Sequence, residues 1–298
     1  MVSAIITTYK RPPEIVQRAA QSVLNQTYKN LELIIVDDSP SDYALRDEVK
    51  KMTETLGGNV RYIQHEKNMG ACVARNTGLS VATGKYVAFL DDDDEWLPEK
   101  SEKQVAIMEK DSEIALVYCG RYSYYTKTNK EILQKTEFHR GMVFEKLILE
   151  NFIGSTSFPL IRKSCVDSVG WFDAAMKASQ DYEVWLRIAK EYKVDYVKTP
   201  LVRYYYHDGE QITKNHAYKV DAYEKLIKKH FDYLKKDKKA HSRCLLYISL
   251  YSAELDRRKA QKAFFKALCL NPTFSELLLK TFKWLYIMPV IEKIKKKA

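Results

Sequence analysis

Cysteine is scarce in this chain, and its five cysteines lie far apart without a C-x-x-C pair. An odd number of widely spaced cysteines argues against a disulfide framework and against a zinc site. It favours free thiols in a reducing cytoplasm. The residues are Cys72, Cys119, Cys165, Cys244 and Cys269.

Several motifs with well-understood chemistry are also missing. The first apolar stretch is followed by Thr-Thr-Tyr-Lys-Arg-Pro, which contains neither G-x-G-x-x-G nor G-K-[ST]. Because these glycine-rich turns bind dinucleotides and phosphates, we exclude a dinucleotide-binding unit and a phosphate-loop site. No H-E-x-x-H motif or Cys/His cluster supports a zinc site.

Long apolar runs are absent too. No uninterrupted apolar segment approaches the roughly 20 residues that cross a bilayer. The sequence passes from Met1 directly into an apolar strand pattern, without the basic region and cleavage site of a signal peptide. We therefore expect neither a signal peptide nor a transmembrane helix.

Positive charge is concentrated at one end of the chain. The formal net charge is +10, yet residues 225–298 hold 19 Lys and Arg against 6 Asp and Glu. Residues 1–224 hold 30 against 33, so this part is mildly acidic. A basic tail of this kind suggests contact with an anionic surface, either a membrane or nucleic acid.

Strand and helix patterns alternate along the first part of the chain. At 298 residues it has room for one large α/β domain with an appendage, or for two domains. Alternating strands and helices predict a mainly parallel sheet with helices on its faces. We expect strands at 2–9, 31–36, 60–63, 86–90, 114–119 and 196–205, and helices from Pro13, over 42–56, 71–81 and 98–111, and from Asp181.

The most unusual stretch is Tyr86–Trp96, in which an apolar run ends in four consecutive aspartates. The run predicts a buried strand, and ligands bind at the carboxyl ends of strands in open α/β sheets. Like charges repel and an unpaired buried carboxylate is costly, so a cation is expected there. Mg²⁺ or Mn²⁺ fits, and such ions are usually shared with substrate phosphates. A solvated acidic turn is the alternative.

Two further polar stretches have a structural and a functional interpretation. Asp181 lies at the start of a predicted amphipathic helix, where an ordinary N-cap competes with a catalytic carboxylate. The tyrosines at 122–125 can stack on a sugar or simply pack. A lone histidine such as His207 is more often a surface or packed residue than a ligand.

From residue 217 the pattern becomes helical, with helices expected over 217–234, 241–254, 257–270 and 274–287. Residues 260–272 resemble one unit of a helical hairpin repeat, but no further unit follows. The segment 277–297 combines aromatic, aliphatic and lysine residues. It fits a membrane interface or a closing helix that packs on the body, and the basic excess favours the membrane.

Taken in order, four motifs in residues 1–215 resemble family 2 glycosyltransferases of the GT-A fold. Any one alone is weak, but four in the right order and spacing form a specific signal. They are Asp37-Asp38-Ser39, Asn68-x-Gly70-x-x-x-Ala74-Arg75-Asn76-x-Gly78, Phe89-Leu90-Asp91-Asp92-Asp93-Asp94-x-Trp96 and Gln180-Asp181-x-x-x-Trp185-x-Arg187.

The resemblance implies a nucleotide-sugar-binding and catalytic GT-A domain over 1–215, followed by a basic helical region over 216–298. It assigns the nucleotide sugar to one set of residues, with Asp37 or Asp38 suited to accept a base N–H and Asp91 or Asp92 nearer the ribose. The set is Thr7, Tyr9, Arg11, Asp37, Asp38, Asn68, Arg75, Asp91 and Asp92.

The metal ligands and the base also follow from the resemblance. Asp91 and Asp93 match the outer positions of the D-x-D motif, with Asp93 as the ligand of Mn²⁺ or Mg²⁺. His207 lies where some relatives place a histidine near the diphosphate, as a second ligand. Asp181 matches the catalytic base, although Gln180 stands where the family commonly has Glu.

The implied reaction is an inverting transfer from a nucleoside-diphosphate sugar, with a UDP-sugar as the expected donor. The expected acceptor is a glycan or lipid-linked saccharide in bacterial surface-polysaccharide synthesis. We expect a cytoplasmic protein held at the inner face of the membrane by its basic helices, without a nucleic-acid partner; a homodimer is compatible. The alternatives are a sugar nucleotidyltransferase, which would need a glycine-rich phosphate loop, and a non-catalytic membrane-associated scaffold.

Overall fold

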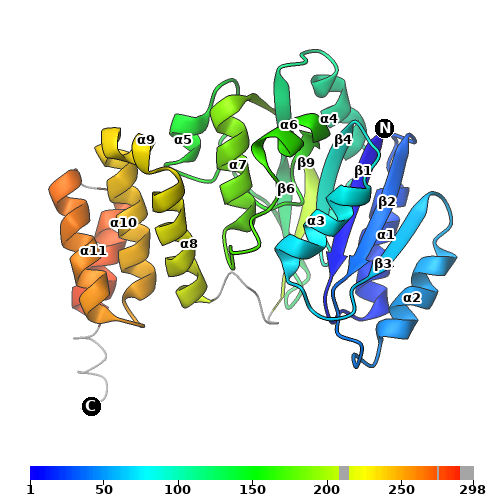
Figure 1. Cartoon of the computed structure of the whole chain (residues 1–298), viewed down its shortest axis with the longest axis horizontal. Coiled ribbons are helices and arrows are strands. Elements are labelled where there is room, and N and C mark those ends of the chain that lie inside the picture. Colours follow the sequence, from blue (N-terminus) through cyan, green and yellow to red (C-terminus); the bar gives the residue numbers. More distant parts are fainter. Residues whose placement is uncertain (208–214, 274, 289–298) are drawn as a thin grey trace. The chain divides into compact units, whose positions relative to one another are not determined.

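The computed structural model describes residues 1–207, 215–273 and 275–288, and the chain divides into two compact units (Figure 1). Unit 1 comprises Met1–Ala174 and Asp181–Asp208, and unit 2 comprises Ala175–Gln180 and Gly209–Ala298. The boundary expected between residues 215 and 216 stays a prediction, because residues 208–214 lie outside the described ranges.

Unit 1 is built on one mixed sheet whose strands follow the order β3-β2-β1-β4-β8-β6-β9-β5, with β7 paired to β6. The pairs β1–β2, β2–β3, β1–β4 and β6–β9 are parallel. The strands are β1 Val2–Thr8, β2 Leu31–Asp37, β3 Val60–Gln64, β4 Tyr86–Asp91, β5 Glu95–Trp96, β6 Ile114–Tyr125, β7 Lys130–Leu133, β8 Leu160–Arg162 and β9 Lys193–Tyr206.

Helices connect these strands and confirm the expected α/β class. Pro13 begins α1, where a fixed φ and a missing N–H cost nothing. The helices of this part are α1 Pro13–Leu24, α2 Arg46–Thr55, α3 Ala71–Val81, α4 Lys100–Met108, α5 Phe144–Leu147, α6 Lys163–Val169 and α7 Gln180–Glu191. The prediction of 71–81 matches α3, whereas those of 42–56 and 98–111 were too long at both ends.

Helices cover both faces of the sheet because side chains alternate along β1. Ala4 and Ile6 share a buried core cluster with residues of α1. Ile5 points the other way, toward Gly78 of α3, where a Cβ would overlap the Ile5 Cγ2 atom. Glycine at 78 therefore lets α3 approach the strand that leads into the site.

Five short elements were not expected from the sequence: β5, β7, β8, α5 and α6. The strand β8 is antiparallel to both of its neighbours, β4 and β6, and interrupts the parallel order. With only three residues, Leu160–Arg162, it is too short to produce a recognisable alternation. Its position nevertheless brings the loop before it, 154–157, to the end of β4.

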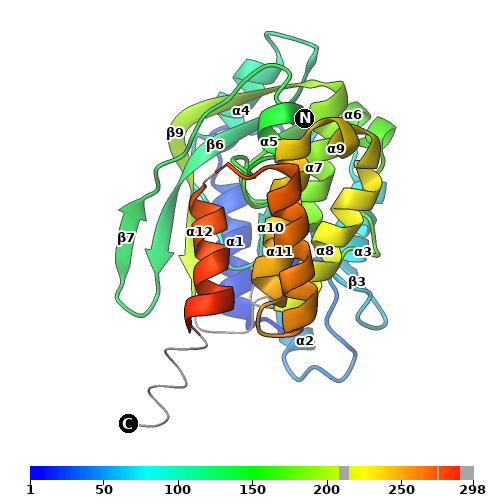
Figure 2. The ribbon, with the colours of Figure 1, turned by 90° about the vertical axis from the view of Figure 1, so that its left-hand side faces the viewer.

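Unit 2 contains a bundle in which α10 packs against α8, α11 and α12 (Figure 2). The helix expected over 217–234 is divided at His230 into α8 and α9. The helix expected over 241–254 begins earlier because the Asp237 carboxylate caps it at the Ala240 N–H. The elements are α8 His216–Lys229, α9 Phe231–Lys236, α10 Lys238–Ser252, α11 Arg257–Leu270, α12 Glu276–Phe282 and a π-helical turn Lys283–Ile287.

All five cysteines are free, as expected, and only Cys269 is exposed. Within the described ranges, no helix has the length and hydrophobicity that would be needed to traverse a bilayer.

The contact between α3 and β1 gives a direct stability prediction. Gly78→Ala forces a methyl group into Ile5, and overpacking of this kind costs about 1–3 kcal/mol. Urea unfolding should therefore show a lower free energy of unfolding for Gly78→Ala. Ser80→Ala, at an exposed position of the same helix, should change it by less than about 0.5 kcal/mol. Equal stability of Gly78→Ala and the unmodified protein would contradict this packing.

Candidate active site

Three neighbouring parallel strands bring most of the predicted residues to one edge of the sheet. Thr7 of β1 lies beside Asp91 of β4, and Thr8 lies beside Asp37 of β2. The carboxyl ends of β1, β2 and β4 therefore meet, as expected for a ligand site in an open α/β sheet.

Asp91 is held by four side chains. Its Oδ1 accepts hydrogen bonds from Thr156 Oγ1 at 3.0 Å and from the Arg75 guanidinium at 3.2 Å. Its Oδ2 accepts one from Ser155 Oγ at 2.9 Å, and its own N–H donates to Ser157 Oγ at 3.1 Å. The end of β4 is thus fixed by the loop 154–157 and by α3.

Asp92 and Asp93 share one arginine. Arg11 donates from Nε to Asp92 Oδ1 at 2.9 Å and from Nη2 to Asp93 Oδ2 at 2.6 Å. Thr8 Oγ1 donates to the other Asp92 oxygen at 2.8 Å. The same Asp93 oxygen lies 2.8 Å from His207 Nε2. The predicted residues Arg11, Asp92, Asp93 and His207 are therefore in direct contact.

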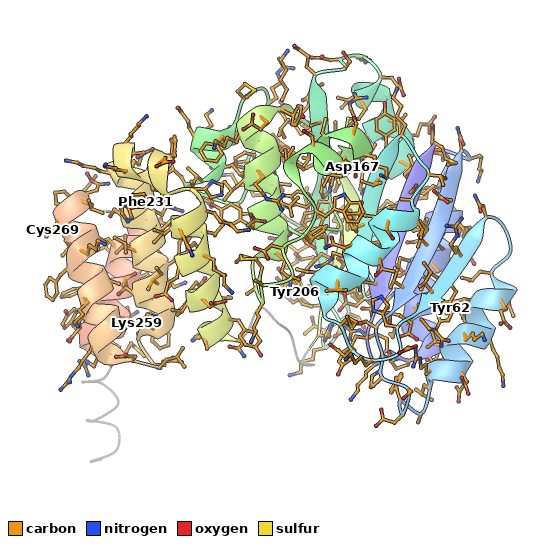
Figure 3. All side chains as sticks on the ribbon, in the orientation of Figure 1. Tyr62, Asp167, Tyr206, Phe231, Lys259 and Cys269 are labelled. Atoms are coloured by element: carbon orange, nitrogen blue, oxygen red, sulfur yellow. The ribbon has the colours of Figure 1, made fainter. Side chains whose placement is uncertain are left out.

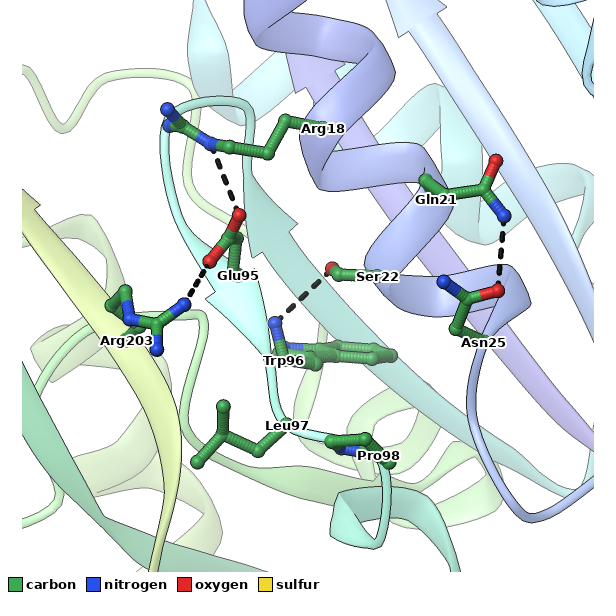
Figure 4. Close-up of a pocket in the computed structure, with 9 residues that line it drawn as sticks. All are labelled: Arg18, Gln21, Ser22, Asn25, Glu95, Trp96, Leu97, Pro98 and Arg203. Carbon is green, nitrogen blue, oxygen red and sulfur yellow. Dashed lines mark hydrogen bonds and ion pairs between the residues drawn. The ribbon is translucent and has the colours of Figure 1, made fainter.

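Asp94 and Glu95 anchor the acidic run on its other side. Asp94 is fully buried and accepts from Ser157 Oγ at 2.6 Å and from the Tyr205 N–H at 3.1 Å. Glu95 bridges Arg18 and Arg203, as Figure 4 shows. These contacts tie the run to β9 and α1.

A pocket of about 380 Å³ lies beside this anchor (Figure 4). Its walls come from α1 and from residues 95–98, together with Arg203. None of the predicted site residues lines it.

The carboxylates of the run are costly to ionise together. The pKa of Asp92 is raised to about 7, chiefly by burial; Arg11 opposes this shift, and the neighbouring Asp93 adds to it. Burial also raises the pKa of Asp94 well above its ordinary value, with Asp91 and Asp93 adding to the shift. A cation placed at this edge would relieve the repulsion.

Asp37 and Asp38 are buried at the end of β2 and organise the neighbouring loops. Asp37 accepts from the Ser39 N–H and from the hydroxyl of Tyr62, which Figure 3 labels. Asp38 accepts from the backbone N–H groups of Met69 and Gly70 and lies 2.7 Å from His65 Nδ1.

Two predicted residues lie at the surface of this edge. Tyr9 is 45% exposed, after the end of β1. Asn68 is exposed on the loop that Asp38 holds. Neither has a side-chain hydrogen bond to the acidic run among the described residues, so their roles stay predictions.

Asp181 lies in the first turn of α7, as its second residue rather than as its cap. Part of the Asp181 surface is exposed, but protein atoms surround its carboxyl closely. The loss of hydration raises the pKa of this carboxyl to about 6. The Tyr182 N–H and the charge of Arg75 oppose the shift, and Asp91 adds to it. Arg75 thus acts on both Asp91 and Asp181.

The other residues of the last motif have structural contacts. Arg187 forms an ion pair with the buried Glu183 and donates to the carbonyl oxygens of Val169, Gly170 and Trp171. Trp185 is buried, and its Nε1 donates to the Gly154 carbonyl at 3.1 Å.

The tyrosines pack against one another across β6 and β9, in agreement with the packing interpretation. The rings of Tyr125 and Tyr206 are stacked with centroids 5.0 Å apart, and those of Tyr124 and Tyr205 are 4.8 Å apart. Tyr206, labelled in Figure 3, is still 38% exposed.

The residues present fit a hard divalent ion that is shared with a substrate. Within the described ranges, no three His, Cys, Asp or Glu side chains form a metal site by themselves. Asp93 Oδ2 and His207 Nε2 do converge, and Asp93 Oδ1 has no hydrogen-bond partner among the described residues. Mg²⁺ typically takes one or two carboxylates and completes its shell with water and phosphate oxygens.

Sequence reasoning missed the hydroxyl groups that hold the run. Gly154-Ser155-Thr156-Ser157 was interpreted only as a turn, yet all three hydroxyl groups contact Asp91 or Asp94. Three consecutive hydroxyl residues after a glycine were the available signal. Arg18, which donates to the Asp93 carbonyl, had no signal of its own.

Comparison with known proteins decides the family. The sequence profile of the family described as Glycosyl transferase family 2 matches residues 3–170. An uncharacterized glycosyltransferase of Methanocaldococcus jannaschii is 30% identical over 68% of this chain and 70% of its own length. The chain belongs to glycosyl transferase family 2.

Two bacterial glycosyltransferases are also similar to this chain. The putative colanic acid biosynthesis glycosyl transferase WcaA of Escherichia coli is 28% identical, over 83% of this chain and 87% of its own length. The Escherichia coli UDP-Glc:alpha-D-GlcNAc-diphosphoundecaprenol beta-1,3-glucosyltransferase WfgD is 32% identical, over 64% and 70%.

A solved structure shares the fold. Crystalline S. aureus TarS superposes with a TM-score of 0.63 and 16% identity, over 91% of this chain. The chain spans about half of the TarS chain, 49% of its length. This likeness confirms the expected GT-A-type architecture.

Proposed function

We propose that this family 2 glycosyltransferase moves a sugar from a UDP-sugar to a hydroxyl of a glycan or lipid-linked saccharide, with inversion at the anomeric carbon. The observation that carries the proposal is Asp181, a crowded carboxylate with a pKa of about 6 that shares Arg75 with Asp91. Carboxylates whose pKa is raised by burial and which share a charged partner are concentrated at catalytic sites.

The similar proteins support the donor and acceptor classes. WfgD is named for transfer from UDP-Glc to a diphosphoundecaprenol-linked sugar, and WcaA for colanic acid biosynthesis. A shorter TarS structure in complex with UDP-GlcNAc has a TM-score of 0.62, and this chain covers 93% of it. A lipid-linked or surface glycan in bacterial polysaccharide synthesis is the acceptor class that fits them.

Asp181 acts as the general base in this mechanism. An alcohol is a poor nucleophile, so its proton passes to the Asp181 carboxylate as its oxygen bonds to the anomeric carbon. The bond from that carbon to the diphosphate oxygen breaks on the opposite face, and its electron pair leaves with UDP. One base therefore suffices for an inverting transfer.

The acidic edge receives the diphosphate end of the donor. When bound, Mn²⁺ or Mg²⁺ supplies Lewis acidity that offsets the charge on the departing diphosphate. Asp93 and His207 would hold the ion, and Asp91 or Asp92 lies nearer the ribose. Arg11 bonds both Asp92 and Asp93 and presents a cation at the same edge.

The nucleoside lies over the ends of β1 and β2 in this proposal. Thr7, Tyr9 and Asp37 or Asp38 are suited to it, together with Asn68 on the loop that Asp38 fixes. The buried Asp37 accepts only from Ser39 and Tyr62 among the described residues, so it keeps lone pairs for a base N–H.

The base assignment predicts the behaviour of Asp181→Asn. The amide cannot accept the proton, so the transfer rate should fall by about 10²–10⁴-fold. UDP binding, measured by calorimetry, should stay within about two-fold because the proposed nucleoside contacts lie at the ends of β1 and β2 and not on α7. Full transfer activity of this variant would remove Asp181 from its role.

The raised pKa predicts the pH dependence of transfer. Because the base must be ionised, the rate should be constant above about pH 7 and fall tenfold per unit below about pH 6. Protonation of Asp181 does not itself unfold the protein. A carboxyl whose pKa is raised in the folded state adds stability as pH falls, and that stability is lost as pH rises through about 6. A rate that stays constant down to pH 4.5 would contradict the assignment.

We infer further that the protein works at the cytoplasmic face of the membrane, through its basic helices. In unit 2, α12 and the following π-helical turn bury Leu278, Thr281 and Leu285 in the bundle. The exposed side chains are those of Leu279, Phe282, Trp284 and Ile287, with exposed fractions of 53, 45, 37 and 42%. The buried residues pack within the bundle, and we propose that the exposed ones meet the membrane.

The exposed face has the composition of an interfacial helix. Lys280 and Lys283 lie among the apolar residues, and the segment 225–298 carries a large basic excess. Apolar and aromatic residues enter the headgroup region, and each lysine near an anionic surface adds about 1 kcal/mol. An anionic bilayer is the matching partner.

This surface predicts binding to lipid vesicles. The full chain should sediment with vesicles of phosphatidylglycerol and phosphatidylcholine but not with phosphatidylcholine alone. The double variant Phe282→Ser and Trp284→Ser should weaken binding by about ten-fold or more, because two apolar side chains are lost. Phe231→Ser changes a 50% exposed residue of α9 and should have little effect. Equal binding by all three proteins would contradict the proposed surface.

A further inference from the structure

The helix α7, which carries the proposed base Asp181, also contacts the loop 154–157. That loop donates hydrogen bonds to Asp91 and Asp94. Trp185 follows Asp181 by four residues in α7, so both lie on one face of the helix, one turn apart. The Trp185 indole is completely buried, and its N–H donates to the Gly154 carbonyl at 3.1 Å. An indole nitrogen is a donor only, so this bond uses its whole hydrogen-bonding capacity.

The loop 154–157 has a conformation that only glycine permits at its first residue. Gly154 has a φ of +89°, and a Cβ there would lie 2.6 Å from the Phe158 ring. The Trp96 indole donates to the Ser157 carbonyl at 3.0 Å. Two buried tryptophans thus hold the ends of the loop, one from α7 and one from β5.

The loop transmits this anchoring to the carboxylates. Ser155 and Thr156 donate to the two oxygens of Asp91 at 2.9 and 3.0 Å. Ser157 donates to Asp94 and accepts from the backbone N–H of Asp91. Any shift of the loop therefore moves both ends of the acidic run.

A second route of contact runs from Trp185 to the same carboxylate. The Trp185 ring packs edge-on against Phe172, with centroids 6.5 Å apart, and Phe172 packs likewise against Phe89 of β4 at 5.1 Å. The Arg75 guanidinium lies over the Phe172 ring at 5.4 Å and bonds Asp91. Asn76 fixes Phe172 by bonding both its N–H and its carbonyl.

We propose that Trp185 is a positioning residue that fixes the spacing between the Asp181 base and the carboxylates of the acidic run. This inference rests on the proposed function, since the spacing matters only if both groups act on one donor and acceptor. Helices and packed aromatic rings are rigid, and an error of about 1 Å in the relative position of reacting groups can cost about 100-fold in rate.

The test uses Trp185→Phe, which keeps an aromatic ring and removes the N–H that holds Gly154. Its matched control is Trp171→Phe, because Trp171 also donates one indole hydrogen bond, to Asp167 at 2.8 Å on the surface. Both variants lose the same chemical group, and only one of them loses the link to the loop. Steady-state transfer and calorimetric titration of Mn²⁺ in the presence of UDP are measured for both.

We expect Trp185→Phe to lower kcat by about ten-fold or more, to leave KM for the donor within about two-fold and to weaken Mn²⁺ binding by about three-fold or more. Trp171→Phe should match the unmodified protein in all three. A purely structural role for Trp185 would lower the melting temperature and leave kcat of the folded enzyme unchanged, and this result would overturn the proposal.

Thr156→Val tests the same link if Trp185→Phe does not fold, since it removes one hydroxyl donor to Asp91 and retains the shape of the side chain. Where both variants fold, a double variant should be no slower than the slower single one, because both changes break one path. Multiplicative effects would indicate independent roles and contradict the link. If the unmodified protein binds no Mn²⁺, the proposed metal fails, and the kcat comparison alone decides the role of Trp185.

Discussion

Repulsion among four consecutive carboxylates at the end of a buried strand is the constraint on which the rest of unit 1 depends. Hydrogen bonds and a neighbouring cation reduce this repulsion. The donors include Arg11, backbone N–H groups, and the hydroxyl groups of Thr8 and the loop 154–157. Burial and the neighbouring carboxylates still raise the pKa values of Asp92 and Asp94, so ionising the whole run is unfavourable without a further cation. A divalent cation at this edge would favour the ionised carboxylates and could also bind a diphosphate.

The aspartates of unit 1 have the same side chain, but their surroundings give them different roles. Asp38 fixes a loop through two backbone N–H groups, and Asp91 is gripped by side chains. Asp93 faces His207, which lies 114 positions further along the chain. Asp181 is crowded at the start of α7, and its raised pKa suits proton transfer near neutral pH.

The sequence was sufficient to predict the α/β class and the acidic strand end, because apolar runs and charge repulsion can be recognised from residue order alone. It was not sufficient to predict which partner each aspartate contacts. The direction of each aspartate side chain is set by the turn in which the Asp94 N–H donates to the Asp91 carbonyl. The partners of Asp91 and Asp94 come from the loop before β8, which pairs antiparallel with β4. The sequence placed Trp185 in a motif but indicated no partner for its side chain. Its hydrogen bond to Gly154 forms because α7 packs beside the loop 154–157 in the folded chain.

The central claim is that the acidic edge binds a divalent cation together with the donor diphosphate. Anomalous scattering from a crystal of the protein soaked with UDP and Mn²⁺ tests it most directly. We predict a manganese peak about 2.0–2.3 Å from an Asp93 carboxylate oxygen and in contact with His207 Nε2 and the diphosphate. A crystal that contains UDP at this edge and shows no manganese beside Asp93 would contradict the account.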